Sequence, residues 1–471
     1  MMEQSQARGT TQPVSHPQEP SRIHLVSLGC PKNLVDSETI LGKLGSGGHI
    51  VVGSPDEADV IVVNTCGFID NAKEESVQAI LEACQWKLDS SSPRKVVVTG
   101  CLGQRYASDI QREMPDVDAI IGLGEYDNLA GIVRGITATD ATSSEQAVIR
   151  TSPQIQECNK EVGRFRLTPS HYGYVKISEG CDNPCTFCSI PGIRGGFRSK
   201  PLSDVKQEVE ELVAAGMKEV VLIAQDTTSY GIDLYGRFRL TDLLETVASV
   251  DGVEWIRILY AYPAFLTDDM IDAISSIDKV LNYLDMPLQH ISDKMLRHMG
   301  RRLTETKTRD LLDRLRERVP GIYLRTTFIV GFPGEDEKEF GKLRDFVREF
   351  AFERLGVFVY SQEEDTPSEN FADQIPEAVK EERLEELMLI QQENAFLHNR
   401  SRVNERVDVL VDEINGDEHG NETLKTRSLG EAPEIDPWIF VPRHRGEAVG
   451  DKVSVKIVDT REYDLIAERA D

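Results

Sequence analysis

Three cysteines lie close together in the middle of the chain, at a spacing that suits an iron–sulfur site. They are Cys181, Cys185 and Cys188, in the run Cys-Asp-Asn-Pro-Cys-Thr-Phe-Cys. Three thiolates on one loop can hold three irons of a [4Fe–4S] cube and leave the fourth iron open to a ligand that is not protein. A zinc loop and three unligated thiols are the alternatives. Zinc favours four ligands, however, and the nearest histidine, His171, is ten residues upstream.

A second trio consists of Cys30, Cys66 and Cys101, which are too far apart in the sequence to form a spacing motif. Each follows directly on a short apolar run that predicts a strand. Parallel strands bring their carboxyl ends to one edge of a sheet, where open α/β domains bind ligands. We therefore expect these thiols to converge and to hold a second [4Fe–4S] cluster with an open iron. The alternative is three buried cysteines that act as small apolar residues.

The two remaining cysteines are predicted to have no role in the chemistry. Cys84 falls inside the apolar pattern of a helix, and Cys158 lies in a segment with the composition of a linker. The chain is large and its amino terminus does not resemble a secretion signal, so reduced thiols are expected rather than disulfides.

The elements that must position the second trio, Cys30, Cys66 and Cys101, form an α/β domain over residues 22–135. Its strand candidates are short, β-branched and continuous, which is typical of a parallel sheet covered on both faces. They span residues 23–28, 60–64 and 96–99. Helical patterns lie between them, so a doubly wound domain is predicted. A linker is expected at residues 136–165.

A second α/β series is predicted over residues 166–400, ending in a charged exit helix. It has six strand candidates with helices between them, two short of a closed eight-stranded barrel, so we expect an open partial (β/α)6 barrel with its site at the strand carboxyl ends. The candidates are residues 174–178, 220–224, 255–259, 283–286, 324–330 and 356–360. Short β-rich segments over residues 401–471 predict a small antiparallel β-barrel.

Composition limits the other possibilities. The 471 residues favour two to four domains, and 40% hydrophobic residues supply material for their cores. The net charge of −27 disfavours nucleic acid as a partner. Residues 1–21 are polar and are expected to be a disordered leader. No apolar run approaches the length of a membrane span, so a cytoplasmic protein with no membrane partner is predicted.

The C-x3-C-x2-C loop after the first barrel strand resembles the signature of the radical S-adenosylmethionine (SAM) superfamily. The resemblance implies that the open iron binds SAM and that electron donation yields a 5′-deoxyadenosyl radical. It also implies SAM contacts from residues near the strand ends, which are Phe187, Gln225, Asp226, Arg257, Gln289 and Arg325. Phe187 could equally be a hydrophobic plug for the loop, and an arginine in a strand often pairs with a core carboxylate instead.

Two clusters followed by a small β domain are similar to the methylthiotransferases, whose carboxyl-terminal module is a TRAM domain. The stretches 27–38, 67–76, 285–291 and 432–436 resemble the RimO-type, protein-modifying branch of that family. This resemblance implies a substrate, the basic small-subunit ribosomal protein S12, free or on the assembled subunit. The net charge of −7 over residues 401–471 agrees with a basic protein partner and makes tRNA a poor one.

The chemistry implied by the resemblance uses two [4Fe–4S] clusters and two SAM molecules. The radical removes a hydrogen from the β-carbon of an aspartate, the amino-terminal cluster supplies sulfur, and a second SAM supplies the methyl group, which gives 3-methylthioaspartate. An external electron donor and a sulfur source are implied, and no catalytic side chain is assigned beyond the cluster ligands. Two alternatives stay open, a tRNA adenosine methylthiotransferase and a non-catalytic iron–sulfur electron carrier or metal-bound RNA-binding module.

Overall fold

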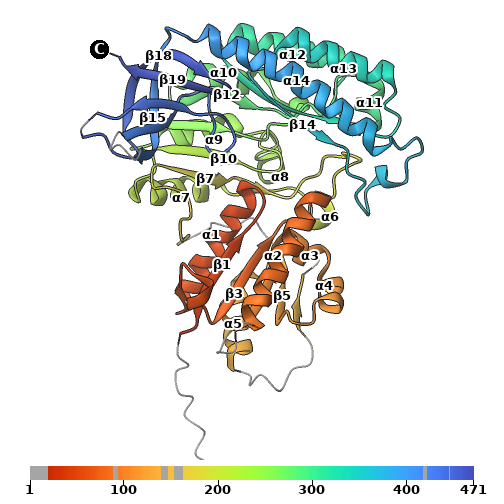
Figure 1. The fold of residues 1–471 in the computed structure, drawn as a ribbon, viewed down its shortest axis with the longest axis vertical. Coiled ribbons are helices and arrows are strands. Elements are labelled where there is room, and N and C mark those ends of the chain that lie inside the picture. Colours follow the sequence, from red (N-terminus) through yellow and green to blue (C-terminus); the bar gives the residue numbers. More distant parts are fainter. Residues whose placement is uncertain are drawn as a thin grey trace, which may run out of the picture.

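The computed structural model describes residues 20–88, 94–138, 147–152, 163–416, 422–444 and 446–470. Three units are visible in Figure 1. An amino-terminal α/β domain stands at one end of the molecule, a six-stranded partial barrel forms the centre of the other end, and a small β-barrel packs beside the partial barrel. The predicted leader lies almost entirely outside the described residues. No helix among the described residues is long and apolar enough to cross a membrane.

The amino-terminal domain is the doubly wound unit that the sequence predicts. Its sheet is entirely parallel, in the order β2-β1-β3-β4-β5-β6. The strands are β1 (Arg22–Ser27), β2 (Ile50–Val51), β3 (Val60–Thr65), β4 (Lys95–Thr99), β5 (Ala119–Ile121) and β6 (Val148–Arg150). The helices are α1 (Pro31–Ser46), α2 (Asp70–Leu88), α3 (Gly100–Arg105), α4 (Ala107–Glu113) and α5 (Leu129–Ala138). Alternate residues of β3 enter two separate apolar clusters, one on each face of the sheet.

The linker prediction for residues 136–165 is wrong in part. Helix α5 continues to Ala138, and residues 148–150 form β6, which pairs with β5 as the sixth strand of the sheet. Three residues are too few to show an apolar pattern in the sequence, and neighbouring Thr, Ser and Ala residues are typical of a linker. Residues 139–146 and 153–162 of this range, including Cys158, lie outside the described residues.

The partial barrel has six parallel strands in the order β14-β13-β12-β11-β10-β7, and the sheet does not close. The strands are β7 (Tyr172–Lys176), β10 (Glu219–Ile223), β11 (Trp255–Ile258), β12 (Val280–Asp285), β13 (Tyr323–Val330) and β14 (Arg354–Val359). A short hairpin of β8 (Ser178–Glu179) and β9 (Arg198–Ser199) follows β7. All six predicted strands are confirmed, with ends that differ by no more than three residues.

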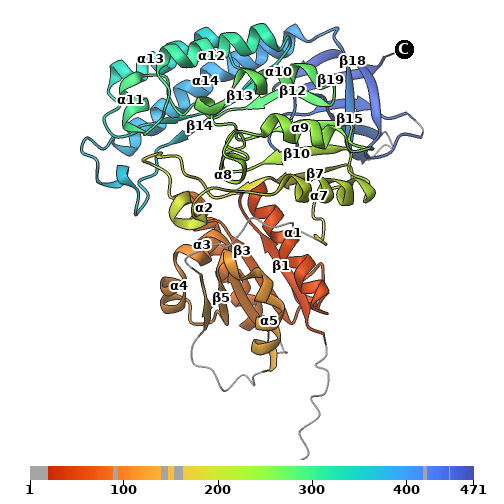
Figure 2. The ribbon, with the colours of Figure 1, turned by 180° about the vertical axis from the view of Figure 1, so that it is seen from behind.

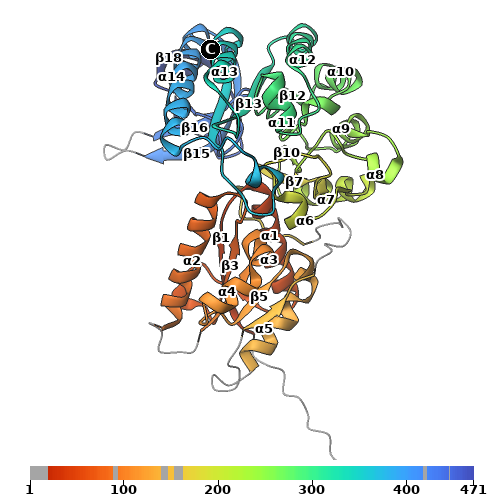
Figure 3. The ribbon, with the colours of Figure 1, turned by 90° about the vertical axis from the view of Figure 1, so that its right-hand side faces the viewer.

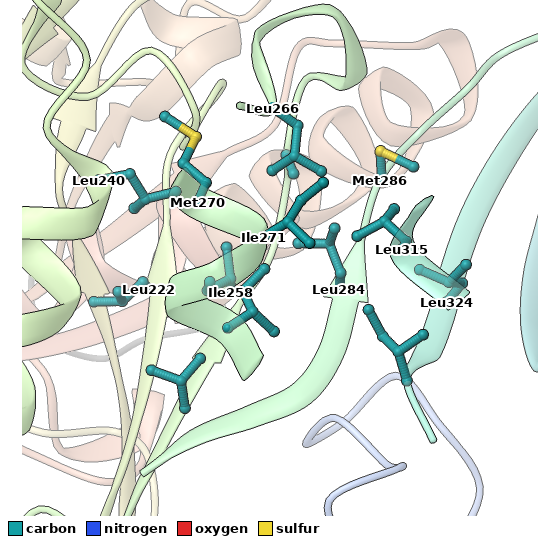
Figure 4. Packing of buried hydrophobic residues seen from close by; sticks show 14 of the residues in the cluster. Leu222, Leu240, Ile258, Leu266, Met270, Ile271, Leu284, Met286, Leu315 and Leu324 are labelled. Atoms are coloured by element: carbon teal, nitrogen blue, oxygen red, sulfur yellow. The ribbon is translucent and has the colours of Figure 1, made fainter. Parts of the chain in front are cut away.

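Helices cover the outer face of this sheet, as Figures 2 and 3 show from two further sides. They are α7 (Leu202–Ala214), α9 (Leu240–Ala248), α10 (Asp268–Ser276), α12 (Glu305–Arg318), α13 (Glu337–Phe350) and the exit helix α14 (Glu377–Ser401). Their apolar faces form the largest core of the molecule with outward side chains such as Leu222, Ile258 and Leu284 (Figure 4). Short helices α6 (Ile190–Arg194), α8 (Ile232–Tyr235) and α11 (Asp293–His298) lie in the loops after strands.

The carboxyl-terminal unit is a closed five-stranded barrel in the order β15-β16-β17-β19-β18. Its strands are β15 (Arg406–Gly416), β16 (Glu422–Arg427), β17 (Ile439–Pro442), β18 (Lys452–Arg461) and β19 (Asp464–Arg469). The prediction of an antiparallel barrel needs one correction, because β17 and β19 pair in parallel. An odd number of strands in a closed barrel cannot alternate in direction all the way round.

The carboxyl-terminal barrel plugs the interior of the partial barrel. The loop between β16 and β17 inserts Ala432 among the inward side chains of the central strands. Around it, Arg427 pairs with Glu219 and Asp412, while Glu431 pairs with Arg354 and Arg402, all of them almost fully buried. Charged groups of the carboxyl-terminal unit therefore cover the amino-terminal ends of β10 and β14, where Glu219 and Arg354 lie.

Glu431→Gln should destabilise the protein most at neutral pH. Although burial opposes it, the arginines Arg402 and Arg354 hold the pKa of Glu431 at about 2, below its usual 4.5. The stabilisation from this carboxylate is present above pH 4.5 and is lost as the pH falls toward 2. We expect the variant to lose about 3 kcal/mol in urea unfolding at pH 7, and less as the pH drops from 4.5. Glu413→Gln, which removes half of a surface ion pair, should change stability by less than about 1 kcal/mol at either pH.

Candidate active site

The six cysteines of the two trios line one cavity of about 450 Å³ between the amino-terminal domain and the partial barrel. Other lining residues lie in the carboxyl-terminal halves of β13 and β14 or follow β10 to β12, so the strand ends of the two parallel sheets face each other across this space. The two trios were predicted from unrelated signals, a local spacing and a set of strand ends. The structure brings them together.

The loop of Cys181, Cys185 and Cys188 is anchored at several points to the rim of the barrel. The backbone N–H of Cys181 donates to the Gly195 carbonyl at 3.1 Å. Within the loop, the Asn183 amide donates to Asp226 at 2.8 Å. A Cβ at Gly300, whose φ is +70°, would lie 2.1 Å from the carbonyl oxygen of Pro184, so only glycine lets this turn approach the loop.

The amino-terminal trio converges because glycines let three loops touch. A Cβ on Gly29 would lie 2.9 Å from the Cβ of Cys66, and one on Gly67 would lie 2.8 Å from the backbone nitrogen of Leu102, next to Cys101. Ser76 on α2 then fixes the second loop, since its hydroxyl bonds both the N–H and the carbonyl of Cys66. The glycine beside each cysteine is thus required for close approach.

Burial and mutual proximity raise the pKa of these thiols. The pKa of Cys66 rises to about 12, mainly through burial and then through Cys101 and Cys30. Burial likewise raises the pKa of Cys188 to about 12 and of Cys181 to about 11. Buried thiols of this kind become thiolates only when a positive centre binds them, which is what an iron cluster provides. Among the described residues, no three Cys, His, Asp or Glu side chains are grouped tightly enough for a single metal ion.

Three of the predicted SAM contacts line the cavity. They are Phe187, Gln225 and Gln289. The side-chain oxygens of Gln225 and Gln289 are buried without a hydrogen-bond partner, as is the hydroxyl of Tyr262 beside them. Buried polar atoms are almost always paired, so these three point to a polar ligand in the cavity. Phe187 also packs edge-on against Phe332, which agrees with the interpretation of this side chain as a hydrophobic plug for the loop.

Three other predicted SAM contacts lie outside the cavity lining. Asp226 bonds Asn183, Thr228 and Ser229 and so supports the cysteine loop from behind. Arg257 pairs with Glu219 at 2.8 Å, and Arg325 pairs with Asp285 at 3.2 Å.

A core carboxylate partner, the alternative for an arginine in a strand, is observed for both Arg257 and Arg325, and the position of neither side chain supports a contact with SAM. The two side chains enter the barrel interior at a depth that the carboxyl-terminal domain occupies. Arg257 also donates to the Leu429 carbonyl, and Arg325 lies 3.6 Å from Asp436.

Sequence reasoning missed the charged residues of the cavity. They are Lys32, Arg194, Arg301 and Glu363. Arg301 donates to the sulfur of Cys185 at 3.5 Å and stacks on Tyr262. None of them belongs to a spacing pattern. Only Lys32 could have been found from the sequence, because it lies two residues after Cys30 in the stretch 27–38.

Arg194 is the centre of a buried ion network between the domains. Its guanidinium bonds Asp36 of α1 at 2.8 Å and both oxygens of Glu179 at 3.1 Å, and Lys176 joins the same two carboxylates. Burial lowers the pKa of Arg194, but Cys101, followed by Glu179, Asp36 and Cys30, holds this pKa well above its usual value. A permanent cation therefore stands next to the amino-terminal trio.

Lys32 reaches from the start of α1 into the mouth of the partial barrel. Its ammonium donates to the Ala224 carbonyl at 3.4 Å and lies 3.2 Å from the centroid of the Tyr260 ring. Burial lowers the pKa of Lys32, and the negative groups Cys30, Asp285 and Glu179 oppose this without pairing with it. The residue crosses from one domain to the strand ends of the other.

Comparisons with known proteins agree with this arrangement. Residues 22–122 match the model of the Uncharacterized protein family UPF0004, residues 175–347 that of the radical SAM superfamily, and residues 403–469 that of the TRAM domain. Curated relatives named ribosomal protein uS12 methylthiotransferase RimO match over 95% of this chain. Those from Acetivibrio thermocellus and Geotalea uraniireducens are 45% and 46% identical, each over 98% of the relative.

Solved structures share the fold at low sequence identity. The radical SAM methyltransferase TsrM from Kitasatospora setae, with cobalamin and a [4Fe–4S] cluster bound, is 15% identical with a TM-score of 0.55. The match covers 74% of this chain and 77% of that one. A second TsrM structure, with tryptophan and a SAM analogue, gives a TM-score of 0.52 over 72% of each chain.

Serine variants of single cysteines should separate the two trios. With two cubes, the reconstituted chain holds about eight irons. We expect Cys66→Ser to lose about half of this iron and keep SAM cleavage to 5′-deoxyadenosine, and Cys185→Ser to lose the other half together with that cleavage. Cys84→Ser is the matched control, because Cys84 is buried in α2 outside the cavity lining, and it should keep all the iron. Equal iron loss in all three variants would contradict the assignment.

Proposed function

Since this chain belongs to the radical SAM methylthiotransferases named RimO, we propose that it places a methylthio group on the β-carbon of an aspartate of ribosomal protein uS12. The chain is a methylthiotransferase that uses SAM and [4Fe–4S] clusters. The observation that carries the proposal is the single cavity lined by two trios of thiols, one from each α/β domain.

Each trio suits one cluster. Cys181, Cys185 and Cys188 would hold the cluster that binds SAM, and the trio from the strand ends of the amino-terminal domain would hold the other. When bound, the clusters and SAM supply the radical, sulfur and methyl chemistry. The contribution of this chain is to place both open irons at one cavity and to keep that cavity largely dry.

The side chains around the cavity suit this task. Gln225, Gln289 and Tyr262 present unpaired polar atoms that would meet the SAM molecule at the barrel rim. On the amino-terminal side and at the edge strand β14, the lining includes the apolar side chains of Phe68, Ile69, Phe358 and Val359. An apolar wall disfavours water near the reacting carbon, where a radical intermediate would otherwise be exposed to side reactions.

A second ion cluster joins the two domains at the edge of the cavity, in the loop after β14. Glu363, in the loop after β14, accepts from Lys73 at 2.9 Å and from Arg105 at 3.2 Å, and both donors come from the amino-terminal domain. This ion cluster is largely buried. It lies beside β14, the edge strand of the sheet, whereas Lys32 contacts residues that follow β10 and β11. It keeps the two domains closed over the site.

A protein substrate agrees with the charge of the chain. The net charge of −27 repels a phosphate backbone and favours a basic ribosomal protein. The net negative charge of residues 401–471 is weaker support for a basic partner. Three of its acidic residues, Asp412, Glu431 and Asp436, are buried against arginines of this chain. These acids serve the contact with the partial barrel. The match to a TRAM domain model makes tRNA the rival substrate to test.

The reaction needs partners beyond the substrate. An external reductant must supply electrons, and a sulfur source must restore the sulfur that is transferred. A cytoplasmic location, where ribosomes and reduced thiols are found, belongs to the same proposal. The substrate would be met free or on the assembled small subunit.

Mass spectrometry of anaerobic reactions would test the proposal. The reconstituted enzyme, with SAM and a reductant, is offered free uS12, small ribosomal subunits and tRNA in parallel. We expect a gain of about 46 Da, from the exchange of a hydrogen for a methylthio group, on one aspartate of uS12. Cys66→Ser should abolish the gain. A gain of the same mass on tRNA adenosine, with uS12 unchanged, would replace this function with the rival one.

A further inference from the structure

We propose that Lys32 binds the side-chain carboxylate of the substrate aspartate and so makes the enzyme selective for aspartate. The inference rests on the proposed function, and it names the group that would recognise the substrate within the cavity. Lys32 is buried, with 9% of its surface exposed, and lines the cavity between the two cysteine trios.

The place of Lys32 fits the place that the substrate must take. The reacting carbon has to lie between the SAM site at the barrel rim and the cluster of the amino-terminal domain. Lys32 stands two residues from Cys30 in one domain, and its ammonium reaches Ala224 and Tyr260, which follow β10 and β11 of the other. An aspartate carboxylate held there would place the β-carbon between the SAM site and the cluster of the amino-terminal domain.

The other charged groups of the cavity are already occupied. Arg194 is neutralised by Asp36 and Glu179, and Glu363 is paired with two cations. Arg301 lies against the sulfur of Cys185, one of the thiols that would hold the SAM-binding cluster. Lys32 differs from them. Within the described part of the chain, no Asp or Glu forms an ion pair with it, and its hydrogen bond to Ala224 is long.

The chemistry of burial supports the same assignment. An aspartate that enters a desolvated cavity loses its hydration, and this is unfavourable unless a cation or several donors replace the water. A lysine ammonium has three donors, of which one meets the Ala224 carbonyl. The face of Tyr260 holds the ammonium in place by a cation–π contact, which takes a second donor and leaves the third for a ligand.

The position of Tyr260 is itself fixed. Its backbone has a positive φ of 62°, and its N–H donates to Asp285 at 3.0 Å. A bulky residue adopts such a conformation only where its surroundings require it. The ring is thereby held under Lys32, and the ammonium is preorganised for a carboxylate before the substrate arrives.

Equilibrium binding of two forms of uS12 tests the inference. One form has the aspartate that the mass spectrum identifies, and the other has asparagine there, which has the same shape without the charge. Anisotropy of labelled uS12 is measured with SAM-loaded, unreduced holoenzyme, so that no turnover occurs. The wild-type enzyme should bind the aspartate form at least about 30-fold more tightly. Lys32→Met should bring the two dissociation constants to within about threefold of each other.

Two variants control for the charge and for the helix. Lys32→Arg retains the cation and should still prefer aspartate. Lys43→Met removes an exposed ion pair with Asp127 at the other end of α1 and should bind like the wild-type enzyme. Lys32→Met should keep the iron content and the cluster spectra of the wild type, which shows that both clusters are still assembled.

Two results would overturn the inference while the proposed function stands. One is an unchanged preference for aspartate in Lys32→Met. The other is loss of the amino-terminal cluster in that variant, which would assign Lys32 to the cluster instead of the substrate. If the wild-type enzyme leaves uS12 unmodified, the mass spectrum reports that separately, and the proposed function and this inference fail together.

Discussion

The arrangement of this molecule depends on one buried ion network between its two α/β domains. Asp36 on α1 and Glu179 beside the cysteine loop share the cations Arg194 and Lys176, and all four are nearly inaccessible to solvent. Burying such charges is costly, so the network adds less to stability than to specificity of orientation. Other relative rotations of the domains would leave charges unpaired. The orientation that pairs them sets the two thiol trios across one cavity.

The carboxyl-terminal barrel completes the partial barrel from the opposite end. The sheet of six parallel strands does not close, and its interior below the rim is filled by side chains that its own strands do not provide. The loop after β16 supplies them, with Ala432 in the apolar cluster and Glu431 among buried arginines. The reacting end of the barrel is thus left to the cofactors and substrate, because a different domain fills the rest.

The positions of the strands could be predicted well from the sequence. The depth at which side chains lie inside the barrel could not. Cysteines at strand ends can be placed because parallel strands share an edge, and glycines beside them mark loops that touch. Whether Arg257 or Arg325 faces the cavity depends on how far the interior is filled, and residues 428–436 decide that from about 100 to 170 positions away. Strand β6 was missed because three residues give no period. Lys32 could be read as part of a motif, but its partner Tyr260 could not.

A series of contacts connects the carboxyl-terminal unit to Lys32 in the cavity. Asp436 of the carboxyl-terminal unit lies beside Arg325, which pairs with Asp285, and Asp285 accepts from the backbone of Tyr260 under the Lys32 ammonium. Asp285 and Arg325 are paired on the neighbouring strands β12 and β13, and Tyr260 follows the next strand, β11, so the series rests on the sheet. A ligand that pairs with Lys32 would therefore be held against both α/β domains and, through Asp285 and Arg325, against the third. The cavity is a property of the whole chain, since no one of its domains supplies all of the walls.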